Sequence, residues 1–286
     1  DALAAAADVV AWEFENVPAA AAARLRQKVP VHPTPRALEI AQDRLPEKRF
    51  FRGLGVGTAP FAPVSGPEDF AAALAETGLP AILKTRRLGY DGKGQRWIRA
   101  PGELAGAWAA LGGVPCLLEG AVAFDRELSV VAARGADGAV RCFPLGCNTH
   151  RDGILVRTDA PAEVSPALQA AADGIAAAAL GALSYVGVLA IELFQVGDAL
   201  WVNELAPRVH NSGHWTQDGA RCDQFEQHMR AVAGLPLGDP ALLHPATVML
   251  NVLGEAPPAA AILAEPLAHL HLYAKAPRPG RKLGHV

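Results

Sequence analysis

The sequence predicts a protein of the α/β class, and three observations support this prediction. Short apolar runs typical of strands alternate with Ala-rich segments typical of helices. Two pairs of strand-like runs are joined by the tight turns Asp137-Gly138 and Gly197-Asp198, which predict β-hairpins. After Pro236 the helical segments give way to short strand-like runs. We therefore expect mixed sheets, with a smaller β-rich part toward the C-terminal end.

The individual elements follow from the same patterns. The N-terminal part predicts a strand over 8–14, a helix over 18–27, a Pro-rich connector, and a helix over 35–54 with a basic face (Arg44, Lys48, Arg49 and Arg52). A strand so near the first residue, followed by a crossover helix, predicts further strands upstream. Loops are expected over 55–63 and 207–217. Further helices are expected at 67–77, 101–111, 166–183 and 223–233, and strands at 80–84, 96–99, 116–119, 127–133, 139–144, 186–196, 200–205, 247–253 and 269–273.

The composition is that of an ordinary globular protein, with 51% apolar and 19% charged residues. A net charge of −3 gives no bulk attraction to nucleic acid or to an anionic membrane, so any anionic ligand must be held by a local cluster of cations. The cysteines form no CxxC pair. Cys142, Cys147 and His150 approach a zinc pattern without a convincing fourth ligand, and we expect reduced thiols in a cytoplasmic protein.

One uncharged stretch, residues 174–191, approaches the length of a membrane span. It contains Gly181, Ser184 and Gly187, which interrupt a continuous apolar helix. A helix that ends near Gly181, followed by a turn and a buried strand, fits this pattern better than a span. No charged segment precedes an apolar one at the start of the sequence, so no signal peptide is expected.

A Gly-rich loop follows the strand that ends in Lys84. Its residues are Gly89, Tyr90, Asp91, Gly92, Lys93, Gly94 and Gln95. The glycines allow the backbone to approach a phosphate closely and to turn N–H groups toward it, while Lys84 and Lys93 add positive charge. The loop is neither a Walker A motif nor a Rossmann fingerprint, and a plain hairpin turn is the alternative interpretation.

Two glutamates end apolar strands in the predicted hairpin around Gly197-Asp198. A three-residue loop would place Glu192 directly opposite Glu204, with Cβ atoms about 5 Å apart, whereas a two-residue turn would place Asn203 opposite Glu192. Both arrangements bring oxygen ligands together. Carboxylate and amide oxygens suit Mg²⁺ that also binds phosphates, and solvent-facing carboxylates are the alternative. The apolar neighbours of Glu192 favour the metal.

Taken together, these parts resemble the ATP-grasp superfamily, and several segments resemble one family within it. The run from Asn203 to Gln217 is similar to the signature of the N5-carboxyaminoimidazole ribonucleotide synthetases, the ATPase subunit of phosphoribosylaminoimidazole carboxylase. The Gly-rich loop and the segments 150–154, 185–188 and 278–285 match the same family in the same order. The resemblance covers essentially the whole chain, and it implies a two-lobed ATP-grasp fold.

The resemblance implies an ATP-dependent ligase of purine biosynthesis, a homodimer, which carboxylates 5-aminoimidazole ribonucleotide with bicarbonate through carboxyphosphate. Its cofactor set would be ATP and Mg²⁺. Another ATP-grasp carboxylase or ligase, or a non-catalytic nucleotide-binding domain, are the alternatives. The implied domains are a remnant of the N-terminal pre-ATP-grasp domain at 1–36, an ATP-grasp domain at 37–235, and a truncated β-rich C-terminal domain at 236–286.

The same resemblance implies roles for individual residues. ATP would be bound by Arg44, Lys84, the Gly-rich loop, Glu119, Glu127, His150, Asn203 and Glu204. Mg²⁺ would be held by Glu192 and Glu204, with Asn203 beside them. Bicarbonate and the ribonucleotide would be met by Glu15, Tyr90, Arg208, His210, Asn211, Ser212, Lys275, Arg281 and Lys282, among which Arg208, His210 and Lys275 would be catalytic.

Two of these assignments have simpler alternatives. The basic segment around Arg278, Arg281 and Lys282 could be a solvated loop, although a Pro-Gly turn that presents two cations together is a plausible phosphate site in an acidic chain. His210 and His214 could be structural, or they could form a zinc pair, but a zinc pair at this spacing needs a helix and the intervening Asn-Ser-Gly favours a loop.

Overall fold

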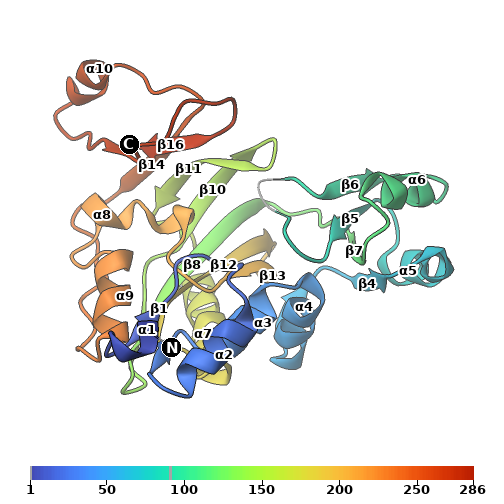
Figure 1. The fold of residues 1–286 in the computed structure, drawn as a ribbon. Coiled ribbons are helices and arrows are strands. Elements are labelled where there is room, and N and C mark those ends of the chain that lie inside the picture. The colour runs from blue at the N-terminus through green and yellow to red at the C-terminus, as the bar shows by residue number, and fades with distance from the viewer. Residues whose placement is uncertain (1, 90–91) are drawn as a thin grey trace.

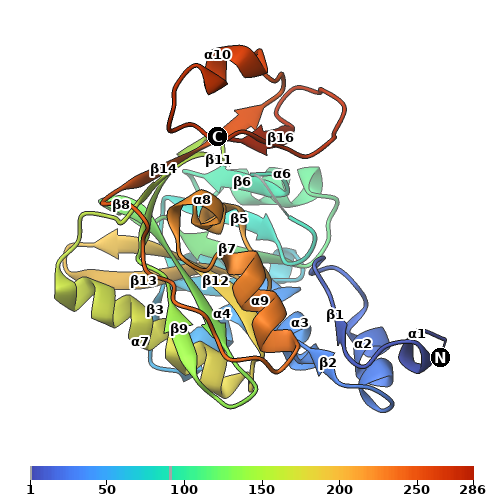
Figure 2. The same cartoon turned by 90° about the vertical axis from the view of Figure 1, so that its left-hand side faces the viewer.

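A large mixed sheet forms the centre of the molecule in the computed structural model, which describes residues 2–89 and 92–286 (Figure 1). Within these residues the sheet has ten strands in the order β15-β16-β14-β11-β10-β8-β12-β13-β3, with β9 beside β8. A separate four-stranded sheet, β4-β7-β5-β6, forms a smaller lobe that projects to one side, and the parallel pair β1-β2 lies near the N-terminus (Figures 1 and 2).

The bounds of the strands are β1 (Val10–Ala11), β2 (Val31–His32), β3 (Gly57–Thr58), β4 (Phe61–Val64), β5 (Ala81–Thr85), β6 (Gln95–Ile98), β7 (Cys116–Gly120), β8 (Arg126–Arg134), β9 (Val140–Cys142), β10 (Gly146–Arg151), β11 (Ile154–Ala160), β12 (Gly187–Val196), β13 (Ala199–Ala206), β14 (Thr247–Leu253), β15 (His271–Leu272) and β16 (Lys282–His285). The α-helices are α1 (Ala2–Ala5), α2 (Ala19–Arg26), α3 (Pro35–Ala41), α4 (Arg44–Gly53), α5 (Phe70–Thr77), α6 (Glu103–Ala110), α7 (Pro166–Ala182), α8 (Thr216–Gly219), α9 (Gln224–Val232) and α10 (Ala259–Leu263). Short 3₁₀ turns are η1 (Pro67–Asp69) and η2 (Asn211–Gly213).

Strand β12 is buried on both faces, which explains its nearly continuous apolar sequence. Leu189, Ile191 and Leu193 face α7 and pack with its buried residues in the main core. Val188 and Ala190 face the opposite side and pack beneath Trp215 and its neighbours in a second core. Because side chains alternate along a strand, Glu192 continues the second face rather than the α7 face. The strand therefore directs this carboxylate away from the main core.

The smaller lobe is a separate layer of sheet and helix. Apolar residues of β5, β7, α5 and α6 form its own core, which includes Leu83, Leu104 and Leu118. Strands β5 and β7 pair antiparallel, so Lys84 and Glu119 lie close to each other on adjacent strands. This lobe supplies Lys84 and the chain that leads into the Gly-rich loop.

The helix expected over 35–54 is wrong as a single element, because the chain breaks at Gln42 and Asp43. Asp43 has an extended backbone (φ −138°) and its carboxylate accepts a hydrogen bond from the N–H of Leu45, which caps α4. The same carboxylate pairs with Arg86 at 2.7–2.8 Å. The side chain of a capping aspartate accepts a hydrogen bond from the backbone at the start of a helix, so a new helix begins after Asp43 and the chain does not form one continuous helix.

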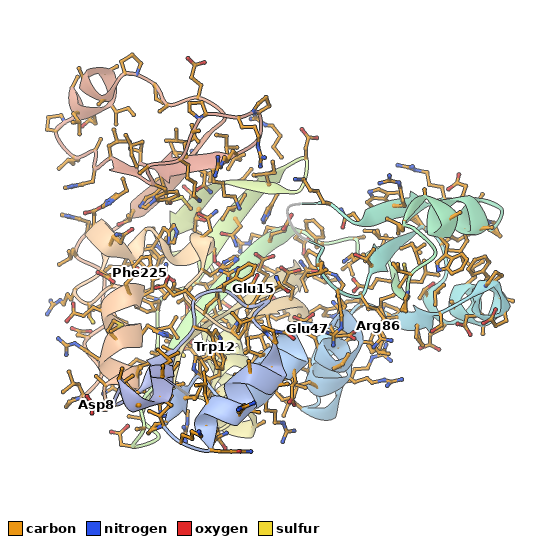
Figure 3. The ribbon with its side chains drawn as sticks, viewed as in Figure 1. Asp8, Trp12, Glu15, Glu47, Arg86 and Phe225 are labelled. Atoms are coloured by element: carbon orange, nitrogen blue, oxygen red, sulfur yellow. The ribbon has the colours of Figure 1, made fainter. Side chains whose placement is uncertain are left out.

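The N-terminal elements also differ from their predicted bounds. The strand expected over 8–14 is only two residues long, and the connector expected after the first helix contains β2, its parallel partner. Trp12, buried beside this pair, packs with Val31 and Leu38, and Figure 3 shows it beneath the segment that carries Glu15. Gln42 donates to the carbonyl oxygens of Glu15 and Val17, which fixes that segment against α3.

Other predictions have mixed outcomes. The hairpins β8-β9 and β12-β13, the long helix before β12, and α9 are confirmed. The loop expected over 55–63 is wrong in part, since it contains β3 and the start of β4, and the polar loop over 207–217 contains η2 and the start of α8. Strands β10 and β11 were not predicted. Residues 174–191 form the end of α7 and the start of β12, and no helix among the described residues has the length and apolarity to cross a membrane.

Candidate active site

A cavity of about 900 Å³ lies between the central sheet and the smaller lobe. It adjoins a second cavity of about 650 Å³, and both are lined by Glu15, Arg44, Glu204, Arg208 and Lys282. Most of the sequence-predicted site residues line the larger one: Glu15, Arg44, Lys84, Gly89, Gly92, Lys93, Gln95, Glu127, His150, Glu192, Asn203, Glu204, Arg208, His210, Asn211, Lys275 and Lys282. Residues from every part of the chain thus meet in one cleft.

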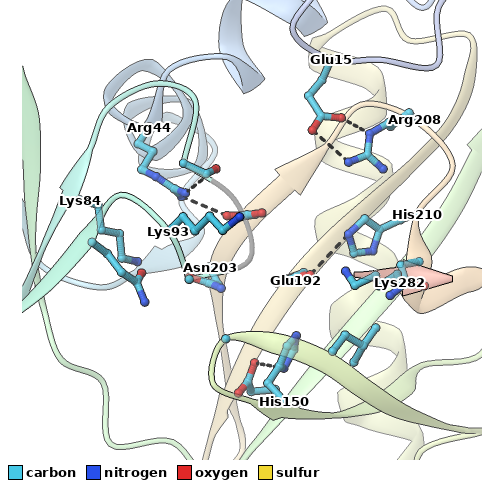
Figure 4. Close-up of a pocket in the computed structure, with 18 of the residues that line it drawn as sticks. Glu15, Arg44, Lys84, Lys93, His150, Glu192, Asn203, Arg208, His210 and Lys282 are labelled. Atoms are coloured by element: carbon cyan, nitrogen blue, oxygen red, sulfur yellow. Dashed lines mark hydrogen bonds and ion pairs between the residues drawn. The ribbon is translucent and has the colours of Figure 1, made fainter. Parts of the chain in front are cut away.

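The cations of the cleft stand on two sides of Glu192 and Asn203 (Figure 4). Arg44, Lys84 and Lys93 lie on one side and Lys282 on the other. Such an arrangement can hold a strongly anionic ligand across the strand ends. The cleft therefore brings several cations together with carboxylates, although the chain as a whole carries a net negative charge.

Arg44, at the start of α4, bridges the lobes. Its guanidinium donates to Glu204 Oε2 at 3.0 Å and to the carbonyl oxygen of Gly89 at 3.5 Å. Burial alone would lower the pKa of Arg44, but the carboxylates of Glu204, Glu47 and Glu119 raise it above its usual value. Arg44 is therefore a permanent cation that links β13 to the Gly-rich loop.

Glu119 does not line the cavity but lies buried beside it. Its carboxylate accepts a hydrogen bond from Lys84 Nζ at 2.7 Å and lies 3.6 Å from Lys48 Nζ. Burial opposes ionisation, yet Lys48 and Lys84 outweigh it and lower the pKa of Glu119 to about 2. Glu119 is thus ionised, and it fixes the direction in which Lys84 points.

Glu192 and Glu204 face each other across β12 and β13, but not for the reason expected from turn length. The turn has two residues, Gly197 and Asp198, and this length alone would place Asn203 opposite Glu192. The register shifts by one residue between Leu193, which pairs with Val202, and Glu192, which pairs with Glu204. A β-bulge at Asn203 causes this shift, so both carboxylates and the amide converge.

The pKa values of the two carboxylates are shifted in opposite directions. Burial raises the pKa of Glu192, and the neighbouring Glu204 raises it further. Arg44 counteracts the burial of Glu204 and lowers its pKa, while 43% of the Glu204 side chain is still open to the cavity. A divalent cation between the two groups would relieve their repulsion and favour the ionised form of both. The residues therefore fit a hard metal ion with oxygen ligands.

Glu127 and His150 form a pair on the neighbouring strands β8 and β10. His150 Nδ1 lies 2.8 Å from Glu127 Oε2. Burial favours neutral imidazole, but Glu127 outweighs it and raises the pKa of His150. Phe124 and Phe194 stack nearby with ring centroids 4.6 Å apart, and both line the cavity with Ile82. This end of the cleft therefore offers an apolar surface beside a polar pair, as a heterocycle with an attached sugar requires.

Arg208 is held by Glu15, which comes from the other end of the chain. Its Nε and one terminal nitrogen donate to the two carboxylate oxygens of Glu15, and a second terminal nitrogen donates to the carbonyl oxygen of Val209. The bidentate contact, which Figure 4 shows, fixes the plane of the guanidinium in the lining of the cleft.

His210 is neutral, and its neighbours define its tautomer. The N–H of Ser212 donates to His210 Nδ1 at 3.3 Å, which leaves the proton on Nε2. Nε2 faces Glu192 Oε1 at 3.6 Å. Burial and the nearby cations, first among them Arg208, lower the pKa of His210 well below its usual value. His210 therefore presents an N–H donor to the cavity.

Gln224, buried beneath the loop, positions both histidines of the 207–217 segment. It exchanges hydrogen bonds with the backbone of His210 and donates to His214 Nδ1 at 2.8 Å. Ser212 is buried under His210 rather than exposed to the cavity. Among the residues that the structure describes, no group of three or more His, Cys, Asp and Glu side chains is arranged to hold a metal.

The Gly-rich loop lies against both lobes. Gly92 and Gly94 have φ of +71°, which other residues adopt only with strain. A Cβ on Gly94 would lie 2.7 Å from Thr85 Oγ1, so this glycine also allows a close approach to β5. Gly94 itself does not line the cavity, and the predicted residues Tyr90 and Asp91 fall outside the described residues.

The C-terminal basic residues divide into two groups. Lys275 and Lys282 line the cavity. Lys275 Nζ lies over the ring of Tyr273, 5.0 Å from the ring centroid. Arg281 is half-buried outside the cavity lining and donates to the carbonyl oxygen of Ala276. Lys282 is therefore the residue of the Arg-Lys pair that faces the cleft.

Sequence reasoning missed two parts of the site. Phe194 lies two residues after Glu192 on the same face of β12, so strand alternation could have identified it. Lys48 was assigned to the basic face of a helix that also contains Glu47, but both are buried beside β13, and nothing in the local pattern predicted that.

Three known family models match successive parts of the chain. The family model of the ATP-grasp domain matches residues 49–225. The model of the ribonucleotide synthetase preATP-grasp domain matches residues 1–42, and that of the phosphoribosylaminoimidazole carboxylase C-terminal domain matches residues 247–286.

Individual relatives are similar over nearly the whole chain. The N5-carboxyaminoimidazole ribonucleotide synthase of Pseudomonas aeruginosa is 52% identical over 279 residues, which are 98% of this chain and 77% of that protein. The crystal structure of the corresponding synthetase from Thermus thermophilus has a TM-score of 0.94 at 54% identity, covering 99% of this chain and 77% of that one. The Aspergillus clavatus enzyme, in complex with ADP and 5-aminoimidazole ribonucleotide, has a TM-score of 0.91 at 31% identity with the same coverage.

Proposed function

This chain belongs to the N5-carboxyaminoimidazole ribonucleotide synthase family of ATP-grasp ligases, and we propose that its cleft performs the reaction of that family. The reaction is the ATP-dependent carboxylation of 5-aminoimidazole ribonucleotide in purine biosynthesis. The observation that carries the assignment to the cleft is the convergence of Glu192, Asn203 and Glu204 between cations from both lobes. ADP release that requires both the ribonucleotide and bicarbonate tests it.

ATP would occupy the part of the cleft between the smaller lobe and β12. The apolar surface of Ile82, Phe124 and Phe194 suits the adenine ring, and Glu127 with His150 suits the ribose hydroxyls. Arg44 and Lys84 would neutralise the phosphates, and the backbone of the Gly-rich loop would donate to them. Glu119 would act on ATP through Lys84, because it is buried behind that side chain.

Mg²⁺ would be held by Glu192 and Glu204, with the amide oxygen of Asn203 beside them. When bound, it would neutralise charge on the phosphate oxygens. Burial raises the pKa of Glu192, whereas Arg44 lowers the pKa of Glu204. A bound cation would favour the ionised form of both carboxylates, which supports this assignment.

The chemistry begins with attack by a bicarbonate oxygen on the γ-phosphorus of ATP, and the bond from that phosphorus to ADP breaks. The product, carboxyphosphate, decomposes to CO₂ and phosphate. The exocyclic amine of the ribonucleotide then forms a bond to the carbon of CO₂ and loses a proton. The protein contributes orientation and neutralisation of charge, and a closed cleft keeps water away from carboxyphosphate.

Arg208, His210 and Lys275 would act on bicarbonate and carboxyphosphate. Arg208 has its plane fixed by Glu15 and offers a planar donor fork to a carboxylate-like ligand. His210 would donate a hydrogen bond from Nε2. A neutral imidazole with a lowered pKa is better suited to this role than to accepting a proton. Asn211 would donate or accept beside them, with Ser212 supporting His210 from below.

The 5′-phosphate of the ribonucleotide would be met by Lys282 in the cleft, with Lys275 beside it and Arg281 on the approach. We expect Lys282→Ala to raise the KM for the ribonucleotide at least tenfold, because a charge-assisted contact contributes about 1.5–3 kcal/mol. The KM for ATP should change little. Steady-state kinetics with each substrate varied in turn measures the difference.

Arg278→Ala is the matched control, since Arg278 is an exposed cation in the same segment and does not line the cavity. An equal rise in both KM values for Lys282→Ala would contradict the phosphate assignment and indicate a general loss of structure.

A homodimer and a cytoplasmic location remain predictions from the family.

A further inference from the structure

From the contacts of α4 with β13, we infer that Glu47 and Lys48 are positioning residues that hold the β-bulge at Asn203 and thereby set Glu204 opposite Glu192. The inference rests on the proposed role of these two carboxylates in holding a divalent cation. It adds to that role the part of the protein that fixes their spacing.

The two side chains bind the backbone on both sides of the bulge. Lys48 Nζ donates to the carbonyl oxygens of Asn203 at 2.7 Å and Val202 at 3.4 Å. Glu47 Oε1 accepts from the N–H of Leu205 at 2.5 Å. Adjacent residues of one helix thus bind the backbone of β13 on both sides of Glu204.

These contacts provide hydrogen-bond partners for backbone groups of β13 beyond its pairing with β3. β3 pairs with β13 only at Trp201 and Val202, so the outer edge of β13 has no β3 partner from Asn203 onward. Buried backbone groups there require other hydrogen-bond partners. Glu47 and Lys48 supply them at the bulge, where the ladder to β12 is also interrupted.

The burial of this pair indicates a specific purpose. Lys48 is 1% and Glu47 is 2% exposed, on a helix for which the sequence predicted a basic face. Buried charges are costly, and apolar residues of similar volume often give a more stable core. Lys48 also pairs with Glu119, but the contacts with β13 give Glu47 and Lys48 a shared task, because without the bulge the two-residue turn would place Asn203, not Glu204, opposite Glu192.

Glu47→Leu and Glu47→Gln separate the hydrogen bond from the charge. Leucine removes the acceptor for the Leu205 N–H, whereas the glutamine amide oxygen retains it. Affinity for Mn²⁺ in the presence of ADP, measured by electron paramagnetic resonance, should fall about tenfold or more in Glu47→Leu, as is typical when a residue that orients a ligand is lost. Glu47→Gln should bind Mn²⁺ about as tightly as the wild type, because it keeps the acceptor for the Leu205 N–H. Affinity for ADP in the presence of EDTA should be unchanged in both.

Phe51→Leu is the control for a weakened α4, since Phe51 is buried on the same helix and packs in the main core. It should lower the Tm without changing the affinity for Mn²⁺. If Glu47→Leu fails to fold, Lys48→Gln provides the same test, because its shorter side chain loses the contact with Asn203. A wild-type affinity for Mn²⁺ in the folded variant would overturn the inference.

Glu204→Gln distinguishes this failure from a failure of the metal assignment. If Glu204→Gln weakens Mn²⁺ binding and Glu47→Leu does not, only the positioning role is wrong. If Glu204→Gln leaves Mn²⁺ binding unchanged, the carboxylates do not hold the cation, and both proposals are wrong.

Discussion

Glu204→Gln should lower kcat by two to three orders of magnitude, one of the two largest effects that we expect from a single substitution. The change preserves the shape of the side chain but removes the ionised partner of both Arg44 and the proposed cation. Loss of one electrostatic contact at a transition state typically costs about 2.7–4 kcal/mol. Turnover at saturating ATP and Mg²⁺ measures the effect, and ADP should still bind.

Glu226→Gln is the matched control, because Glu226 lies on α9 in a surface ion pair with Arg230. Surface pairs of this kind contribute about 0–1 kcal/mol to stability, so turnover should be unchanged. If Glu204→Gln turned over as fast as this control, Glu204 would not be a metal ligand.

Lys84→Met should lower kcat/KM for ATP by about 10²–10³-fold. The substitution removes a cation that faces the proposed phosphates, at a site where charge develops during phosphoryl transfer. It also leaves Glu119 with Lys48 as its remaining close lysine, so the pKa of Glu119 should rise. Initial rates at varied ATP concentration give the change in kcat/KM.

Two further variants make this result specific. Lys84→Arg keeps the charge and should retain more activity than Lys84→Met, although the guanidinium differs in shape from an ammonium. Arg36→Met removes an exposed cation from α3 and should have no effect. Equal activities of Lys84→Met and Arg36→Met would exclude Lys84 from the phosphate site.

The sequence was most informative where chemistry and local pattern coincide. An acidic residue inside the apolar run of β12 predicted that Glu192 has a special environment, and the hairpin pattern brought Glu204 and Asn203 to the same place. The final register could not be predicted, because it depends on a bulge that α4 stabilises from outside the hairpin. The length of the turn is a property of the hairpin alone. It therefore left two alternatives, with either Glu204 or Asn203 opposite Glu192.

Contacts over long distances in the chain were beyond local patterns. Arg208 and Glu15 are 193 residues apart, and only the family resemblance suggested that both belong to one site. Lys48 was assigned only to a basic helix face, because helix periodicity does not reveal that β13 and β7 bury it. The break before α4, by contrast, was readable: Asp43 is a favoured capping residue at the start of a helix.

The assignment of the cleft is tested most directly by ADP release, with ATP and Mg²⁺ present and the ribonucleotide and ¹⁸O-labelled bicarbonate each added or omitted. We predict full-rate ADP release only when both are present, with one ¹⁸O atom transferred from bicarbonate to phosphate as carboxyphosphate decomposes. ADP release at the same rate without the ribonucleotide, or phosphate without the label, would contradict the proposed reaction at this site.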